Sequence, residues 1–299
     1  MARLDETKLS SMPPLGVLPL GVMTSLGDDP LASLLKVRDM GFSTCQLGNP
    51  PEQYVYGGDS ENLTRKVREA LDKTGVRVTS VFIMFKGHIW DRISGPRTIG
   101  FVPEVTRAQR AVHACRISDW ARSIGLDAVT THVGFIPENP NDPVYPGLIA
   151  FLKEFIRYCE DNGQWFIFET GQETPGTLRR AIDDAGLYNI GVNLDAANLL
   201  LYGKGRPLEA VEAFGEFVKS THCKDGLWPE DDVKLGRETP LGEGDVHYEK
   251  LIPALYAKGF RGPLTIEREI SGPQQIADIR RAKRILERIR AKVMGQGEG

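Results

Sequence analysis

Four residues of metal-binding type each stand at the end of an apolar, strand-like run in the second half of the chain. Glu169 ends FIFE, Asp195 ends GVNLD, His222 ends STH and Glu267 ends LTIE. Three carboxylates and one imidazole form a hard, oxygen-rich donor set that suits Mn²⁺, Mg²⁺ or Co²⁺ and also accepts Zn²⁺. Each residue taken alone could equally form a rim salt bridge or a loop cap. Four in the same place on consecutive runs favour a single metal site.

The elements that carry these residues repeat along the chain as a short apolar run, a turn and a segment with helical periodicity. Eight runs have the character of strands: residues 15–23, 43–47, 76–85, 127–135, 164–169, 189–195, 218–224 and 262–269. The helical segments are residues 30–40, 60–75, 105–125, 145–163, 174–186, 207–220, 247–259 and 273–293. Glycine, which adopts the left-handed conformation of a helix C-cap at little cost, stands at or near several helix ends: Gly41, Gly75, Gly125, Gly163, Gly186 and Gly259.

The alternation of strands and helices predicts an α/β fold, a single (β/α)8 TIM barrel. Continuous apolar strands suit a parallel sheet that is buried on both faces, and eight units can close it without exposed edges. We expect the barrel over residues 14–294, with tails at 1–13 and 295–299. A doubly wound open sheet is the alternative, although no GxGxxG follows the first strand. In a barrel the active site lies at the C-terminal ends of the strands, so the four residues would face one rim.

The composition of the chain limits the classes of partner that the protein is expected to bind. Apolar residues make up 41% and charged residues 26% of the chain, and the net charge of −3 argues against nucleic acid as a partner. We find neither a signal peptide nor a run of about 20 apolar residues that could cross a membrane. The four cysteines are widely spaced, which indicates reduced thiols in a cytoplasmic protein: Cys45, Cys115, Cys159 and Cys223.

The chain resembles the xylose-isomerase-like barrel superfamily, which includes sugar isomerases and epimerases, inosose dehydratases and type-IV apurinic endonucleases. The resemblance covers nearly the whole chain. It is most specific in FETGQET (168–174), NLDAANLLLYG (193–203), THCKDG (221–226), PLGEGDV (240–246) and GPLTIERE (262–269). It implies that one divalent metal, Mn²⁺ as first choice, is held by four residues: Glu169, Asp195, His222 and Glu267.

The resemblance also implies a catalytic role for two of these ligands. Epimerases of the superfamily are thought to use the two glutamates as bases on opposite faces of the substrate, which here are Glu169 and Glu267. A Lewis-acid metal stabilises the enediolate formed when the proton alpha to a carbonyl leaves, and a carboxylate within reach carries that proton. With a base on each face, the proton can return on the other side and invert the centre.

Three further candidates lie at the ends of the fourth and seventh strands. His132, in THVGF, is either a substrate ligand or acid/base, or a hydrogen-bonded structural histidine. Lys224 and Asp225 follow His222; Lys224 either binds a substrate oxygen or forms an ordinary ion pair. Cys223 is expected to pack as a small apolar residue.

Other candidates lie in the loops. Asn198 stands where several epimerases carry a histidine that touches the substrate, and this departure disfavours their usual sugar pose. Glu173 and Arg268 are candidate contacts for hydroxyl or carboxylate groups. The loop at 85–103 is long enough to be a lid or substrate wall and brings two more candidates. They are Lys86 and Trp90, the latter either stacking on a sugar or packing under the loop.

The leading hypothesis is a metal-dependent isomerase or epimerase of carbohydrate metabolism, acting on a ketose or a related keto-sugar or polyol. The alternative is a lyase or dehydratase acting on a keto-sugar or inosose-like substrate through the same enediolate. A DNA-repair endonuclease is disfavoured because it would need many more histidines than the five present. A non-catalytic binding protein would be favoured by a broken ligand set, and here the set is complete. The expected partner is a small sugar-like molecule, with a homo-oligomer allowed and no nucleic acid or membrane.

Overall fold

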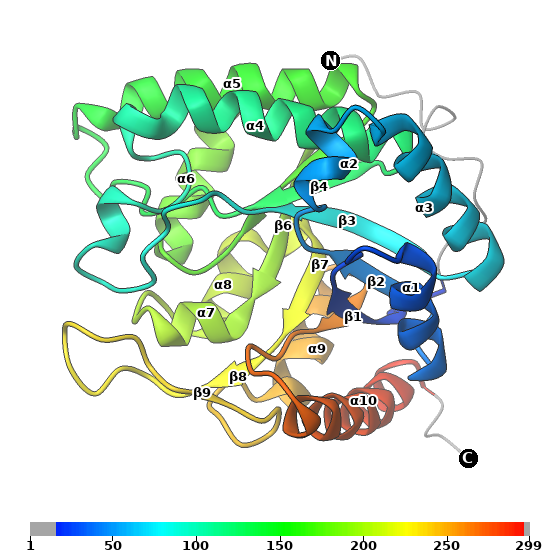
Figure 1. The fold of residues 1–299 in the computed structure, drawn as a ribbon. Helices are drawn as coiled ribbons and strands as arrows, with labels where there is room; N and C mark the ends of the chain where they lie inside the picture. Colours follow the sequence, from blue (N-terminus) through cyan, green and yellow to red (C-terminus); the bar gives the residue numbers. More distant parts are fainter. Residues whose placement is uncertain (1–15, 296–299) are drawn as a thin grey trace.

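Eight parallel strands close into a barrel in the computed structural model, which describes residues 16–295 (Figure 1). The strands are β1 (Leu20–Thr24), β2 (Thr44–Leu47), β3 (Arg77–Ile83), β4 (Ala128–Thr131), β5 (Trp165–Glu169), β6 (Ile190–Asp195), β7 (Val218–Cys223) and β10 (Leu264–Ile266). Their order around the barrel follows the chain, and β1 pairs with β10 to close it. The predicted (β/α)8 barrel is confirmed and the open sheet is wrong. The predicted tails lie outside the described residues, apart from Gly295.

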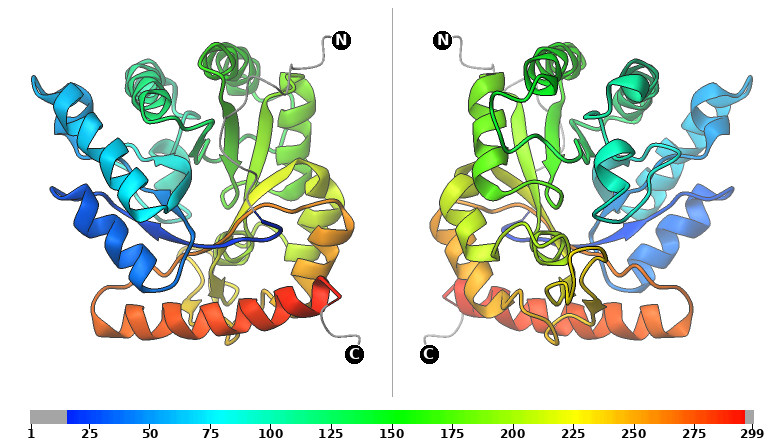
Figure 2. Two further views of the ribbon diagram at one scale, coloured as in Figure 1. Left: turned by 90° about the vertical axis from the view of Figure 1, so that its right-hand side faces the viewer. Right: turned by 90° about the vertical axis from the view of Figure 1, so that its left-hand side faces the viewer.

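Helices cover the outside of the barrel, with α10 along one side (Figure 2). They are α1 (Pro30–Asp39), α2 (Glu52–Tyr56), α3 (Ser60–Thr74), α4 (Glu104–Ser123), α5 (Val144–Asp161), α6 (Pro175–Ala185), α7 (Ala196–Leu201), α8 (Pro207–Phe214), α9 (Tyr248–Ala257) and α10 (Pro273–Val293). Within residues 16–295, short 3-10 helices occupy Gly95–Arg97 and Gly215–Phe217. The prediction of a helix over 207–220 was therefore too long, because Gly215 starts a tighter turn and Val218 already belongs to β7. The short helices α2 and α7 were not predicted.

Alternation along β5 decides which of its side chains reach the barrel interior. Phe166 and Phe168 pack against each other with ring centroids 4.8 Å apart, and Phe166 also contacts Phe155 of α5. They therefore lie on the helix-facing side. Because successive residues of a strand point to opposite faces, Ile167 and Glu169 point into the barrel. The apolar run thus carries a carboxylate to the inner end of the strand.

Caps fix where the loops around the site begin and end. The Thr174 hydroxyl accepts a hydrogen bond from the backbone N–H of Thr177, so the N-cap of α6 lies five residues after Glu169 and Pro175 is the first residue of the helix. At the other end of α6, Gly186 adopts a φ of 62° and its N–H bonds to the carbonyl of Ile182. This is the left-handed C-cap that the sequence predicted.

A small hairpin follows β7 at the same end of the barrel. It pairs β8 (Asp225–Gly226) with β9 (Glu238–Thr239) in antiparallel fashion, with residues 227–237 as its loop. Among the described residues, no helix is both long and apolar enough to cross a membrane.

Candidate metal centre

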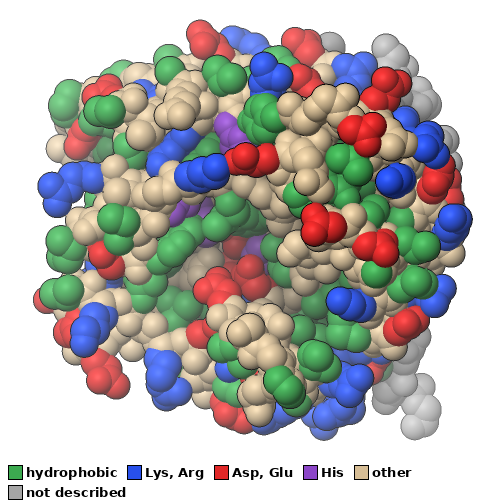
Figure 3. Space-filling view, in the orientation of Figure 1, with side chains coloured by type: hydrophobic (Ala, Val, Ile, Leu, Met, Phe, Trp, Pro, Cys, Tyr) green, Lys and Arg blue, Asp and Glu red, His purple; other side chains and the backbone are tan. Residues whose placement is uncertain are grey.

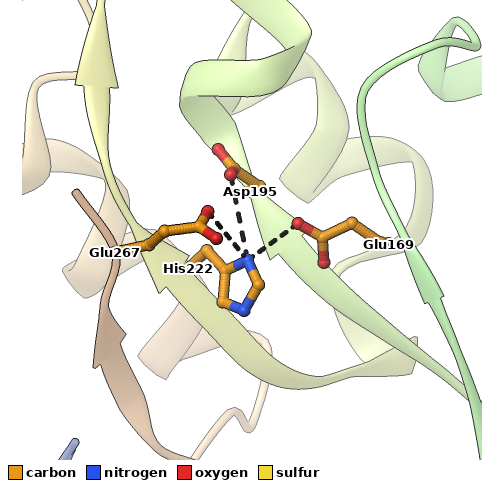
Figure 4. A group of neighbouring side chains, drawn as sticks. All are labelled: Glu169, Asp195, His222 and Glu267. Carbon is orange, nitrogen blue, oxygen red and sulfur yellow. Dashed lines mark ion pairs between the residues drawn. The ribbon is translucent and has the colours of Figure 1, made fainter. Parts of the chain in front are cut away.

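Four side chains converge at the C-terminal end of the barrel. Glu169, Asp195, His222 and Glu267 come from the ends of β5, β6, β7 and β10, and one donor atom of each lies within 4.8 Å of all the others (Figure 4). His222 Nδ1 lies 2.9 Å from Glu169 Oε1, 3.3 Å from Glu267 Oε2 and 3.9 Å from Asp195 Oδ2. The space-filling view shows acidic and histidine side chains at the bottom of a hollow on this face (Figure 3).

The donors fit a divalent cation. His222 Nδ1 and Asp195 Oδ2 are buried, and each meets charged groups of the cluster itself: Nδ1 lies 2.9 Å from Glu169 Oε1, and Oδ2 lies 3.0 Å from Lys224 Nζ. Oδ1 of Asp195 is already used, since it accepts a hydrogen bond from the backbone N–H of Asn198 and caps α7. Two buried carboxylates, Glu169 and Asp195, with the largely buried Glu267 beside them, are costly unless positive charge compensates them. A carboxylate and imidazole group of this kind can therefore hold a hard divalent metal.

The surroundings shift the pKa values of the donors in different directions. Burial raises the pKa of Glu169 and raises that of Asp195 to about 7. Burial would also raise the pKa of Glu267, but Lys224 and His222 hold it well below its usual range. Burial opposes the charge on His222, yet Glu169 and Glu267 raise its pKa well above 6.5. Without a metal, the cluster therefore retains protons that a cation would displace.

Two buried amides that were not predicted hold the donors in place. Gln46 of β2 contacts Nε2 of His222 through its Oε1, on the side of the ring away from the carboxylates. Asn193 of β6 donates a hydrogen bond from Nδ2 to Glu169 Oε2. Both amides stand inside runs that were interpreted as apolar strands. A polar amide within a fully buried strand was the one sequence signal that could have revealed them.

Lys224 lies inside the cluster rather than on an exposed rim. Its Nζ is 3.0 Å from Asp195 Oδ2, 3.0 Å from Glu267 Oε2 and 2.6 Å from Glu269 Oε1, and its side chain is buried. The ammonium group therefore forms ion pairs with three carboxylates, and one of them, Glu269, was not predicted. With a divalent cation, the charges of the three carboxylate ligands and Lys224 would sum to zero.

His132 and Trp90 lie beside the centre, linked to His222 through the ring of Phe82. The His132 ring meets Phe82 edge-on at 5.4 Å and Trp90 at 5.5 Å, and its Nδ1 has no hydrogen-bond partner among the described residues. Burial, with the charge of Lys224 adding to it, lowers the pKa of His132 to about 3, so the ring is neutral. Trp90 also packs edge-on against His88, yet 41% of its surface is exposed at the mouth.

Two predicted contacts do not reach the cluster. Lys86 is exposed and forms an ion pair with Glu52 at 2.5 Å. Arg268 forms ion pairs with Glu238 at 2.9 Å and with Asp278 at 2.8 Å, behind the site. Both cations are therefore engaged elsewhere on the protein.

The three remaining candidates, Asp225, Glu173 and Asn198, differ in how many hydrogen bonds their side chains form. The carboxylate of Asp225 accepts hydrogen bonds from the backbone N–H groups of residues 226, 242 and 246, so it fastens the PLGEGDV loop. Glu173 is buried with no hydrogen-bond partner for either oxygen in the described part of the chain, and burial raises its pKa to about 8. Asn198 lies on the first turn of α7, with its Nδ2 3.4 Å from the carbonyl of Thr170. Cys223 is buried, as predicted, and burial raises its pKa to about 12.

The long loop after β3 contacts the hairpin loop. Nη1 of Arg92 donates to the carbonyl of Asp231 at 2.8 Å, and the backbone N–H of Arg92 reaches the carbonyl of Val233 at 3.4 Å. The two loops, 84–103 and 227–237, are thus linked to each other beside Trp90.

A profile described as xylose isomerase-like TIM barrel matches residues 34–291 of the chain. A xylose isomerase domain protein from Planctomyces limnophilus is 36% identical in sequence and has a TM-score of 0.87, over 93% of this chain and 99% of that one. A search of curated proteins found no significant match.

Two less similar structures share the fold. A xylose isomerase-like TIM barrel protein from Mycobacterium smegmatis, solved in complex with magnesium, is 18% identical with a TM-score of 0.70, over 92% of this chain and 97% of that one. A D-tagatose 3-epimerase-like protein is 20% identical with a TM-score of 0.71, over 94% of this chain and 100% of that one.

Proposed function

The chain belongs to the xylose isomerase-like TIM barrel family, and from this premise we propose that it is a metal-dependent isomerase or epimerase of a ketose or related keto-sugar. The observation that carries the proposal is the convergence of four metal-type donors, two of them glutamates. Figure 4 shows Glu169 and Glu267 on opposite sides of the His222 imidazole. That arrangement supports a proton carrier on each face of a substrate.

The four free cysteines support a cytoplasmic location.

The residues would divide the work as follows. A divalent cation held by Glu169, Asp195, His222 and Glu267, with Mn²⁺ as first choice, would stabilise the negative charge that develops on the substrate oxygens. One glutamate takes the proton next to the carbonyl and the other returns it. His132, which is neutral and buried, offers a ring nitrogen to a substrate oxygen. Trp90 covers an apolar sugar face at the mouth.

A lyase or dehydratase is the second candidate. Asn198, where several epimerases carry histidine, favours it, because the substrate is then held differently beside the same metal. A probable 3-DHS dehydratase from Bacillus anthracis has the same fold, with a TM-score of 0.66 and 11% identity. In this reaction the leaving group departs from the carbon next to the enolised position. His132, which is neutral, is the candidate to donate a hydrogen bond to it, and the glutamate that took the alpha proton can supply the proton that it needs.

Deuterium exchange tests both candidates. Ketoses and 3-keto sugars are incubated in D2O with the protein loaded with Mg²⁺ or Mn²⁺, quenched with chelator and analysed by NMR. We expect deuterium at one carbon next to a carbonyl, together with an epimer or isomer. Loss of water would establish the dehydratase instead, and the absence of exchange with every candidate would contradict enolisation altogether.

A further inference from the structure

A chain of buried polar side chains crosses the barrel interior and ends on the far side of His222. Gln46 of β2 donates through Nε2 to Ser80 Oγ at 2.6 Å and lies 3.3 Å from Thr130 Oγ1. Ser80 of β3 and Thr130 of β4 also bond to each other, at 2.9 Å. All three side chains are buried. Their hydrogen bonds therefore fix the Gln46 amide from behind.

A β-bulge places Ser80 in this chain. Cys45 pairs with Val78 and Leu47 pairs with Val81, so β3 has one more residue than β2 between these pairs. Thr79 and Ser80 thus lie opposite the single residue Gln46, and the Thr79 hydroxyl donates a hydrogen bond to the carbonyl of Cys45 at 3.2 Å. Such a bulge re-aims the side chains beside it, and here it leaves Ser80 next to Gln46.

The orientation of the Gln46 amide decides which nitrogen of His222 carries a proton. With its two N–H groups directed at Ser80 and Thr130, the amide presents Oε1 to His222, and an oxygen can only accept. Nε2 of His222 must then donate, so that in the neutral ring, the form that binds a cation, the lone pair lies on Nδ1, the nitrogen that faces the three carboxylates. Phe82 lies over the ring with a centroid distance of 5.7 Å and restricts its rotation.

We propose that Gln46 is a positioning residue that holds His222 in the Nε2–H form and so makes Nδ1 a metal ligand. Metal-bound histidines are commonly oriented by a hydrogen bond at their other nitrogen. Here that partner comes from β2, on a different strand from all four donors, and Ser80 and Thr130 hold it in turn. The inference rests on the proposed metal site but concerns a residue with no contact to the metal or substrate.

Metal affinity tests the proposal without a substrate. Gln46→Leu removes the acceptor at similar size, and titration calorimetry with Mg²⁺ or Mn²⁺ should show binding weakened by about 10- to 100-fold, the usual effect of losing such a partner. Gln46→Glu restores an acceptor oxygen and should return the affinity towards that of the natural protein. Gln164→Leu is the matched control. It removes another buried amide, which bonds Ser118 and the carbonyl of Leu126 away from the centre, and it should leave the affinity unchanged.

The tautomer itself is visible by NMR. In protein with ¹⁵N-labelled histidine and a diamagnetic metal, His222 should carry its proton on Nε2, with the signal assigned through a His222→Asn variant. A proton on Nδ1 in the loaded protein, or normal affinity in Gln46→Leu, would overturn the inference. If Gln46→Leu does not fold, Ser80→Ala frees the amide and should still weaken binding. If the natural protein itself binds no metal, it is the proposed function that fails.

Discussion

The two glutamates of the cluster have different surroundings. Glu169 is buried, accepts a hydrogen bond from Asn193 and has a raised pKa, whereas Glu267 is partly exposed, pairs with Lys224 and has a lowered pKa. When the surroundings raise the pKa of one carboxyl group and lower that of another, a single site can supply both a proton donor and a proton acceptor. In the metal-free protein Glu267 is the ionised partner.

Changing either glutamate to glutamine separates ligation from proton transfer. The amide of Glu169→Gln or Glu267→Gln can still coordinate through oxygen but has no basic site. We therefore expect turnover to fall by about 10²- to 10⁴-fold and to stay low at saturating metal. Steady-state rates over a range of Mn²⁺ concentrations measure this. Full rescue by added metal would make both residues ligands only, with His132 as the leading acid/base and the lyase favoured.

Metal binding should weaken as the pH falls. The raised pKa values of His222, Glu169 and Asp195 (about 7) mean that the metal-free cluster holds protons near neutrality. Each proton competes with the cation, so affinity should rise with pH until these groups are ionised, and binding should release protons. Calorimetry in buffers of different ionisation enthalpy counts the released protons. Affinity that is independent of pH between about 6 and 8 would contradict this account.

At the scale of elements, the residues at the ends of strands could be predicted from the sequence, whereas contacts between side chains across the barrel interior could not. The ends of β5, β6, β7 and β10 could be predicted because each apolar run stops at a carboxylate or histidine. Gln46 could not be assigned to His222, because their contact depends on the closure of the barrel and on the bulge in β3. Likewise, nothing in the order of residues showed that Arg268 pairs with α10.

Lys224 links three neighbouring elements, since it follows β7 and pairs with carboxylates at the ends of β6 and β10. Lys224→Met leaves the buried Asp195 and the partly exposed Glu267 without their cation, so we expect the metal-free protein to lose about 3–5 kcal/mol of stability. Added metal should restore much of the loss, and denaturation with and without chelator measures it. Lys258→Met, which breaks a surface pair with Glu212, should cost about 1 kcal/mol or less under both conditions. Equal losses in the two variants would refute the role of Lys224.

At the scale of the whole molecule, barrel closure brings the acidic strand ends together on one face of a chain with a net charge of −3. The cations that were candidates for the substrate are engaged by carboxylates: Lys86 by Glu52, Arg268 by Glu238 and Asp278, and Lys224 by the cluster. The PLGEGDV loop is fastened by a carboxylate, Asp225, and so does not form an anion cradle.

This charge pattern disfavours phosphorylated sugars. We expect a free ketose or keto-sugar to have a higher kcat/KM than its phosphate ester, because the three candidate cations are already paired with carboxylates and the PLGEGDV loop is fastened by Asp225 rather than open to an anion. Paired kinetic measurements on a sugar and its phosphate provide the comparison. A clearly higher kcat/KM for the phosphate ester would show that the site does bind a phosphate group and would contradict this prediction.

The central claim, that four convergent side chains hold one divalent cation, is tested most directly by metal analysis of the purified protein and of Asp195→Ala. Asp195 directs Oδ2 to the centre, where Lys224 Nζ lies 3.0 Å from it. Its loss leaves three donors and an under-coordinated ion. Elemental analysis after equilibration with Mn²⁺ should give one ion per natural chain and little or none in Asp195→Ala. Full occupancy in the variant, or no metal in the natural protein, would contradict the account.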